Sequence, residues 1–264
     1  MQAPTRLRNR RTLTPVVGRA RFAERVDLDP SSPWWGEHRA RYRWAAAQLG
    51  PGRVLDVACG SGLGLPVLAD GGRAVIGVDL DPAAAAGAAA LAVAPVVAAD
   101  GGRLPFATAS FDAVTSFETI EHVNDPVGLL AEVRRVLRPG GVLYASSPNA
   151  VVTRPVDGVP RNPFHLQEYD PDGFAQVLGT AFAEVEVLGQ ATSDGYGRYS
   201  LWTPAPGVPG AVQALALKAT LRLPAGMRER VSQLALRRPF APAPEDYTFG
   251  EVTDRSHVLV ARCR

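Results

Sequence analysis

The sequence predicts an α/β fold in which a mostly parallel sheet carries helices on both faces. Short apolar runs alternate with helical stretches from about residue 37 to residue 190, and strands that alternate with helices form parallel sheets. The first apolar run ends in closely spaced glycines that open a helix. Such a strand, turn and helix is typical of the first unit of a ligand-binding sheet.

Five apolar runs in this region have the length and composition of buried strands. These are residues 54–58, 74–78, 96–99, 111–117 and 142–147. Helices are expected beside them at residues 39–49, 63–69, 83–92, 126–137 and 172–178. Pro82 stands in the first turn of the third helix, and Asn124 or Asp125 can cap the fourth.

The last third of the chain departs from this alternation. Residues 183–188 and 257–261 are predicted strands, and the segment between them is rich in proline with one basic helical stretch at residues 212–236. The predicted organisation therefore has four parts. They are a basic N-terminal arm (1–36), a core (37–190), an insertion or lid (191–255) and a final core strand (256–264).

The composition excludes several classes of protein. The 264 residues include 28 Lys and Arg and 26 Asp and Glu, a net charge of +2, so a nucleic-acid-coating protein is not expected. Only Cys59 and Cys263 are present, which excludes a disulfide scaffold and fits a reducing compartment. No apolar run approaches the ~20 residues of a membrane span, and the basic N-terminus does not continue as a signal peptide. We expect a cytoplasmic monomer or homodimer, with peripheral membrane contact through residues 212–238 as an open alternative.

The glycine loop after the first strand is the strongest signal for a ligand. Gly60 and Gly62 let a ligand approach the backbone because no Cβ stands in the way. A dinucleotide-binding loop would have a further glycine where this chain has Leu65. Asp56, on the strand itself, would repel a pyrophosphate and attract an ammonium group. The loop therefore disfavours a nicotinamide cofactor.

Acidic residues end the next two strands. Asp79 follows Gly60 by 19 positions, a spacing that suits a carboxylate on ribose hydroxyls. Asp100 follows the third strand, where it can accept from an adenine amino group. Together with Asp56 they describe a pocket for a ribonucleoside with a positively charged amino-acid tail, and S-adenosylmethionine fits that description.

Five segments of the chain resemble, in order, the motifs of class I S-adenosylmethionine-dependent methyltransferases. They are residues 54–64, 76–79, 99–106, 111–125 and 135–141. The resemblance implies a Rossmann-like sheet of seven strands whose last strand is antiparallel and inserted beside the sixth. It also implies that Gly60 and Gly62 contact the cofactor through their backbone, that Asp79 binds the ribose and that Asp100 binds the adenine. Gly101 or Arg103 would lie beside the adenine ring, and Phe117 near the methionine part.

Residues 37–42 read Glu-His-Arg-Ala-Arg-Tyr. They resemble the E-H-x-x-R-Y stretch of methyltransferases that are often found with polysaccharide and glycolipid pathways. By that resemblance Arg41 binds the cofactor carboxylate, and a guanidinium can do so through two parallel hydrogen bonds. A solvated helix face is the alternative.

The E-x-x-E-H pattern at residues 118–122 is the candidate catalytic centre. On a helical turn Glu118, Glu121 and His122 would share one face. The pattern resembles that of ubiquinone-pathway O-methyltransferases and of enzymes that 2′-O-methylate small-RNA ends, where these residues and a further histidine bind a divalent ion. His165 is the candidate for that histidine. We predict a Mg²⁺ or Mn²⁺ site from these four residues; a metal-free histidine base or a structural role is the alternative.

The acceptor pocket is expected in residues 150–171 and 191–255, because variation in such folds is concentrated in loops. Asn149 follows a Ser-Pro pair and is either an acceptor contact or a turn residue. Tyr169 belongs to a set of aromatic residues that can stack on a sugar or a flat ring. The set is Trp34, Trp35, Phe164, Tyr169, Tyr196, Tyr199 and Trp202.

The predicted reaction is O-methylation of a small-molecule or glycan acceptor, namely a hydroxyl of a glycan, glycolipid or glycosylated metabolite. A small aromatic or polyketide acceptor is the first alternative. RNA 2′-O-methylation, with the arginine-rich arm holding phosphates, is the second.

Overall fold

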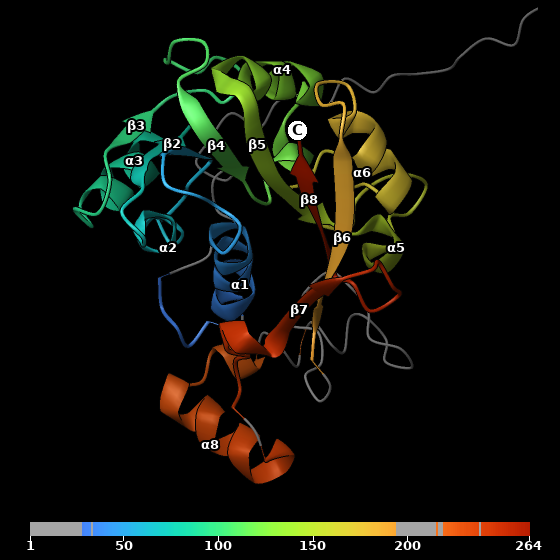
Figure 1. The fold of residues 1–264 in the computed structure, drawn as a ribbon. Helices are drawn as coiled ribbons and strands as arrows, with labels where there is room; N and C mark the ends of the chain where they lie inside the picture. Colours follow the sequence, from blue (N-terminus) through green and yellow to red (C-terminus); the bar gives the residue numbers. More distant parts are fainter. Residues whose placement is uncertain (1–27, 33, 194–214, 216–218, 238) are drawn as a thin grey trace, which may run out of the picture.

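A computed structural model describes residues 28–32, 34–193, 215, 219–237 and 239–264. Within this part of the chain the strands form one eight-stranded sheet (Figure 1). From one edge to the other they are β3 (Val96–Ala98), β2 (Ala74–Asp79), β1 (Arg53–Val57), β4 (Phe111–Ser116), β5 (Leu137–Pro148), β8 (Val258–Cys263), β6 (Val185–Thr192) and β7 (Tyr247–Gly250).

The sheet is parallel from β3 to β5. Strand β8 lies antiparallel between β5 and β6, and β7 pairs antiparallel with the outer side of β6. The carboxyl ends of the parallel strands therefore meet at one edge of the sheet, which is where ligands bind in open α/β sheets.

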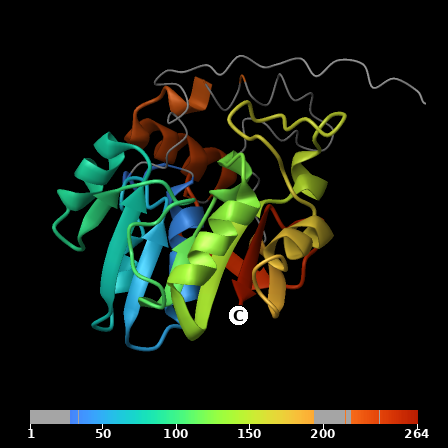
Figure 2. The ribbon, with the colours of Figure 1, turned by 90° about the horizontal axis from the view of Figure 1, so that it is seen from above.

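Helices cover both faces of the sheet (Figures 1 and 2). On one face lie α1 (Trp35–Ala46), α2 (Leu65–Ala69) and α3 (Pro82–Ala89), and on the other α4 (Pro126–Val136) and α6 (Pro171–Leu178). The short elements are η2 (Ile120–His122), α5 (Ala150–Thr153) and η3 (Pro244–Asp246), and α8 (Ala225–Leu236) lies beyond α1.

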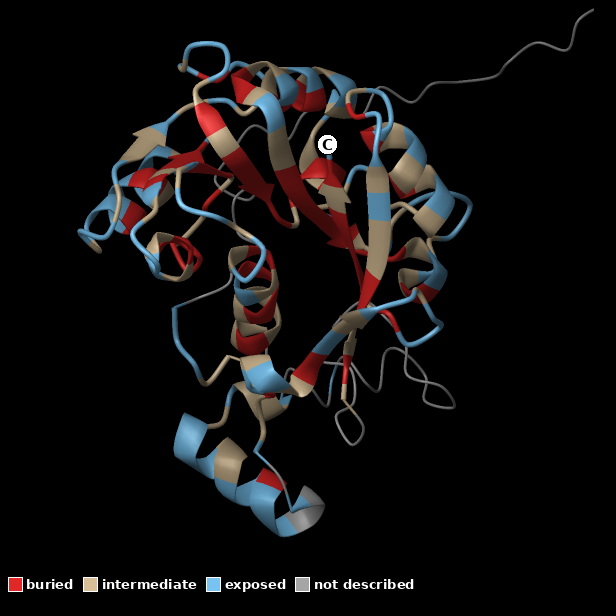
Figure 3. Cartoon of the chain, viewed as in Figure 1, coloured by how far each residue is buried: buried red, intermediate tan, exposed pale blue. Residues whose placement is uncertain are grey.

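The two faces have separate apolar cores because side chains alternate along a strand. In β1, Val54 packs with Tyr42 and Leu65 on one face, whereas Leu55 packs with Leu129 on the other. Strands β4 and β5 lie between both helix layers. Accordingly β4 is buried along most of its length and β5 from Leu143 to Ser147 (Figure 3).

Three helices begin with the same Asp-Pro pair. Asp81, Asp125 and Asp170 each accept a hydrogen bond from a backbone N–H in the first turn of α3, α4 and α6. A proline follows each of them at the first helical position, where a missing N–H costs nothing. Of the two residues proposed to cap α4, Asp125 does so.

The prediction of an α/β fold with a mostly parallel sheet is confirmed, but the strand count is corrected from seven to eight. Strand β7 comes from the segment predicted as an insertion, and its four residues extend the sheet beyond β6. Strand β5 also starts earlier than expected, at Leu137, which pairs with Phe111. The register with β4 then shifts across the Arg-Pro-Gly-Gly run, where Gly140 has a φ of 78°.

The basic helical stretch expected at residues 212–236 is divided. Residues 219–221 are helical, and α8 starts afresh after Pro224, which lacks the N–H that a continuous helix needs. The basic arm up to residue 27 and Tyr196, Tyr199 and Trp202 lie outside the described residues. No helix in the described part is both long and apolar enough to cross a bilayer.

Candidate active site

The glycine loop follows β1 in a left-handed conformation. Ala58 and Gly60 have φ angles of 60° and 55°, and Cys59 N–H between them donates to Val78 O at 2.9 Å. A Cβ added at Gly60 would meet no atom within 4 Å, whereas one at Gly64 would lie 2.1 Å from the Tyr42 ring. The loop therefore presents open backbone at Gly60 and packs tightly at Gly64.

Asp79 connects this loop to the end of β2. Its Oδ2 accepts from Gly60 N–H at 2.8 Å and its Oδ1 from Asp81 N–H at 2.9 Å. At the end of the neighbouring strand, Asp100 is exposed and accepts from Gly102 N–H at 2.9 Å. A Cβ on Gly101 would lie 2.9 Å from Leu129. These residues therefore lie at the carboxyl ends of β1, β2 and β3, which are adjacent in the sheet.

Asp56 and Phe117 are buried below this edge rather than exposed on it. Both oxygens of Asp56 lie within 3.3 Å of the Tyr42 hydroxyl, and Thr115 Oγ1 donates to Oδ1 at 2.7 Å. Burial raises the pKa of Asp56 to about 7, although these hydrogen bonds act in the opposite direction. Phe117 packs edge-on against Tyr42 at 5.0 Å between ring centroids. Asp56 thus links α1 and β4 through Tyr42 and Thr115, and it has no exposed surface for the direct ammonium contact that the sequence suggested.

Arg41 is fully buried, so the alternative of a solvated helix face is wrong. Its Nη1 donates to Gln190 Oε1 at 2.7 Å and lies 3.5 Å from Glu37 Oε1. Its Nε and Nη2 are buried and have no hydrogen-bond partner. Since an unsatisfied buried guanidinium is costly, this arrangement fits an anionic ligand group that binds here. Gln190, on β6, was not recognised from the sequence because it lies 149 residues from Arg41.

Glu118 lies outside the group of side chains whose ligand atoms converge, although the sequence predicted that it would join them. Its φ of 50° interrupts any helical turn before Glu121. Its side chain instead accepts from Ser146 Oγ at 2.7 Å. The Glu118 charge also contributes to the raised pKa of Glu37, after the larger effect of burial. Glu118 therefore lies near Glu37, which is itself close to Arg41.

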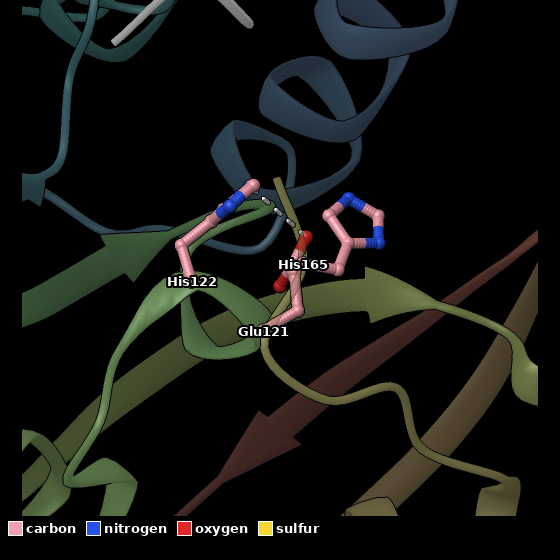
Figure 4. Close-up of side chains that lie close together, drawn as sticks. All are labelled: Glu121, His122 and His165. Atoms are coloured by element: carbon pink, nitrogen blue, oxygen red, sulfur yellow. Dashed lines mark ion pairs between the residues drawn. The ribbon is translucent and has the colours of Figure 1, made fainter. Parts of the chain in front are cut away.

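Glu121, His122 and His165 do converge (Figure 4). One ligand atom from each lies within 4.8 Å of the others, and His122 Nε2 is 3.9 Å from Glu121 Oε1. His122 Nδ1 lies 3.0 Å from Phe164 O, a backbone acceptor that places the proton on Nδ1 and turns the Nε2 lone pair toward the group. The loop is held here because Leu166 N–H donates to Glu121 O at 2.8 Å.

His165 belongs to a second, buried network. Its Nδ1 lies 2.7 Å from Glu168 Oε1, and its Nε2 lies 2.8 Å from Asn162 Nδ2. Thr153 Oγ1 donates to the other oxygen of Glu168. The carboxylate fixes the Nδ1–H tautomer, so that Nε2 is the basic nitrogen. Neither Glu168 nor Asn162 was predicted as a site residue from the sequence, although each lies three positions from His165.

The two predicted acceptor contacts differ in their surroundings. Asn149 is fully buried, its Nδ2 donates to Ser256 O, and its Oδ1 caps α5 by accepting from Val151 N–H. The structure therefore supports the turn alternative for Asn149. Tyr169 has a buried hydroxyl with no hydrogen-bond partner. Burial and then the Glu121 charge raise its pKa to about 12, so the hydroxyl stays protonated beside that carboxylate.

Known proteins are similar to the core of this chain. Residues 55–145 match the family described as a methyltransferase domain. A probable S-adenosylmethionine-dependent methyltransferase of Mycolicibacterium smegmatis is 38% identical over 156 residues, which cover 58% of this chain and 60% of that protein. The chain therefore matches three fifths of the length of this relative.

The names of two further relatives state the quinone on which each acts or the quinone pathway to which it belongs. A demethylmenaquinone methyltransferase of a Mycobacterium species (strain KMS) is 40% identical over 124 residues, covering 46% of this chain and 54% of its own. A ubiquinone biosynthesis O-methyltransferase of Xanthomonas oryzae pv. oryzae is 37% identical over 117 residues, covering 42% of this chain and 49% of its own.

A solved structure shares the fold over most of its length. The S-adenosylmethionine-dependent methyltransferase of Thermotoga maritima superimposes with a TM-score of 0.55, covering 87% of this chain and 91% of that one. At 17% sequence identity this likeness concerns the arrangement of strands and helices alone.

Proposed function

Because the core of this chain is a class I S-adenosylmethionine-dependent methyltransferase domain, we propose that the protein transfers a methyl group from S-adenosylmethionine to a hydroxyl oxygen. When bound, the cofactor supplies a methyl group on an activated sulfonium centre. The protein must then align the acceptor and take its proton.

Two observations fit the cofactor. The left-handed Gly60 leaves open space where a side chain would project, as a backbone that approaches a nucleoside requires. The buried Arg41 has two nitrogens without hydrogen-bond partners, and a carboxylate can accept from both. Asp79 and Asp100, at the ends of β2 and β3, would then contact the ribose and the adenine.

The buried His165–Glu168 pair is the main observation that supports methyl transfer to an oxygen atom. Glu168 orients the imidazole through Nδ1, and Asn162 Nδ2 donates to Nε2 in the free protein. An acceptor hydroxyl that replaces this amide donor would give its proton to Nε2. An imidazole oriented by a carboxylate is a typical general base near neutral pH.

Divalent-metal assistance is the second form of the proposal. Glu121, His122 and His165 provide a carboxylate and two imidazoles within 4.8 Å of one another, a donor set that suits Mn²⁺ or Mg²⁺ and, through the imidazoles, softer cations. Such an ion would lower the pKa of an acceptor hydroxyl. In this form His165 is a ligand rather than a base.

For the acceptor we favour a hydroxyl of a glycan or glycolipid, on the resemblance of residues 37–42 and on the buried Arg41 within them. A quinol or other aromatic hydroxyl is the second candidate. Similarity to the ubiquinone-pathway O-methyltransferase supports it, as does Tyr169 beside the Glu121 cluster.

The experiment has a binding step and a transfer step. S-adenosylhomocysteine is expected to raise the melting temperature progressively as its concentration exceeds the dissociation constant, whereas NAD leaves it unchanged. Methyl-labelled S-adenosylmethionine is then incubated with glycolipid, quinol and RNA fractions, with and without a chelator. Label that survives chelation supports the histidine base, and label that vanishes supports the ion. A shift by NAD alone, or no transfer to any hydroxyl, contradicts the proposal.

A further inference from the structure

Helix α8 carries an exposed apolar stripe. Met227, Val231 and Leu234 are exposed to 51%, 49% and 85%, and their spacing of four and three residues places them on one side of the helix. Single exposed apolar residues are ordinary on protein surfaces, but three on one side of a helix form an apolar patch, and such patches are typical of interaction sites.

The opposite side of α8 is polar and faces the protein. Arg228 Nη2 donates to Ser31 Oγ at 3.2 Å, and its guanidinium lies 5.4 Å from the centre of the Phe240 ring. Ser232 is buried on the same side. The helix is therefore inverted relative to an ordinary surface helix, which turns its apolar side to the core.

Exposed basic residues accompany the stripe. Arg230 lies within α8, Arg222 precedes it and Arg237 caps its end, and all three are exposed. The one acid of the helix, Glu229, is engaged, because it accepts from Phe240 N–H at 3.0 Å and from Gln233 Nε2 at 2.9 Å. The surface around the stripe is thus cationic and apolar together.

We propose that α8 binds an anionic lipid surface, with Met227, Val231 and Leu234 in the acyl boundary and the arginines against the headgroups. Apolar residues with neighbouring cations on one side of a helix are what an interfacial helix needs. The exposed arginines at the two ends of the stripe match the negative charge of anionic headgroups. The proposal does not depend on the reaction proposed above.

The position of α8 relative to the central strands bears on what membrane contact could do. Strands β4 and β5 run toward α1, and α8 lies beyond α1 on that side of the molecule (Figure 1). Glu121 and His122 lie in η2, which follows β4, and His165 lies in the segment between α5 and α6. A bilayer bound to α8 would therefore lie on the side of the molecule to which the carboxyl ends of β4 and β5 point.

Vesicle co-sedimentation of the full chain tests the proposal. Phosphatidylcholine vesicles with phosphatidylglycerol are expected to bind the protein, and phosphatidylcholine vesicles alone are not. Val231→Glu and Leu234→Glu should each lower binding by about tenfold, because a charge replaces apolar contact. Raised salt should weaken binding, since the arginine contribution is screened.

Ala225→Glu is the matched control. It adds the same charge to an exposed position at the start of the same helix, away from the stripe, where an acid favours the helix dipole. It should retain most of the binding. Equal loss in Ala225→Glu and Val231→Glu would show attraction by net charge alone and overturn the apolar contact. No binding to anionic vesicles by a folded protein would overturn the proposal as a whole.

Discussion

At the scale of single residues, the buried side chains with unusual surroundings mark the site. Arg41 is held at one end by Gln190 and Glu37, while its other nitrogens have no hydrogen-bond partner. A cation in this state is stabilised once an anion binds. The binding energy of the cofactor carboxylate should therefore depend strongly on this one side chain.

Replacing Arg41 tests that dependence. In Arg41→Met the affinity for S-adenosylhomocysteine should fall by roughly 10- to 100-fold, the equivalent of hydrogen bonds to a charged group. Isothermal titration measures it. Arg43→Met, two residues along α1, removes an exposed guanidinium that pairs with Glu245, and its affinity should stay at the wild-type value. Equal affinities in both variants would remove Arg41 from the cofactor site.

The Glu168 carboxylate should act on turnover rather than on cofactor binding. In Glu168→Gln the side chain no longer fixes the Nδ1–H tautomer of His165, so kcat should fall by about 10- to 100-fold, as for other groups that orient a working histidine. The dissociation constant of S-adenosylhomocysteine should not change. Glu251→Gln, at an exposed position after β7, is the control. A loss of cofactor affinity that matches the loss of kcat would indicate a structural role instead.

Asp56 makes stability depend on pH. Its folded-state pKa is raised by burial to about 7 from an ordinary 3.8, so the folded protein keeps a proton that the unfolded chain releases. The contribution is fully present below about pH 4 and is lost as the pH rises through about 7, to a limit on the order of 4 kcal/mol.

Asp56→Asn removes this titration while retaining the shape of the side chain. The melting temperature of wild type minus that of Asp56→Asn should therefore decrease between about pH 4 and pH 7 and then remain level. Thermal unfolding across that range measures the difference. Parallel curves would show that Asp56 ionises normally in the folded protein.

At the scale of elements, the glycine loop separates packing from ligand binding. Gly64→Ala would place a Cβ 2.1 Å from the Tyr42 ring and should cost about 1–3 kcal/mol of stability, as overpacked cores do. Gly60→Ala meets no atom but adopts a left-handed φ, so it should cost about 1–2 kcal/mol. Its new Cβ enters the ligand space, and S-adenosylhomocysteine should bind at least about tenfold more weakly.

Gly87→Ala provides the control for both variants. Gly87 lies within α3, and a Cβ there meets nothing, so the substitution should raise stability by about 0.5–1 kcal/mol. Thermal unfolding with and without S-adenosylhomocysteine separates the three variants. Wild-type affinity in Gly60→Ala would contradict the assignment of this loop to the cofactor.

At the scale of the whole molecule, the sequence predicted those features that depend on residues close together in the chain, such as strands, helix caps and the glycine loop. The strands around residues 54–58 and 111–117 were found because they are short and mostly apolar. Asn124 and Asp125 were both proposed as the cap of the helix that starts at Pro126, and Asp125 is the one that caps it. The glycine loop and Asp79 were placed at a sheet edge by their order in the chain.

Other features depend on contacts that no local pattern contains. Gln190 reaches Arg41 across 149 positions. Strand β7 is four residues long and is stabilised by pairing with β6. The expected helical face of Glu118, Glu121 and His122 failed because the backbone turns left-handed at Glu118. His165 was found, but the buried Glu168 that orients it required the folded loop.

The measurement that tests the central claim most directly is the position of the transferred label. Protein and methyl-labelled S-adenosylmethionine are incubated with the acceptor fraction that takes up label, and the product is analysed for the atom that carries the methyl group. The account predicts a methyl ether that forms with wild type and not with His165→Ala, although that variant still binds S-adenosylhomocysteine. Label on carbon or nitrogen, or a methyl ether formed equally well by His165→Ala, would contradict it.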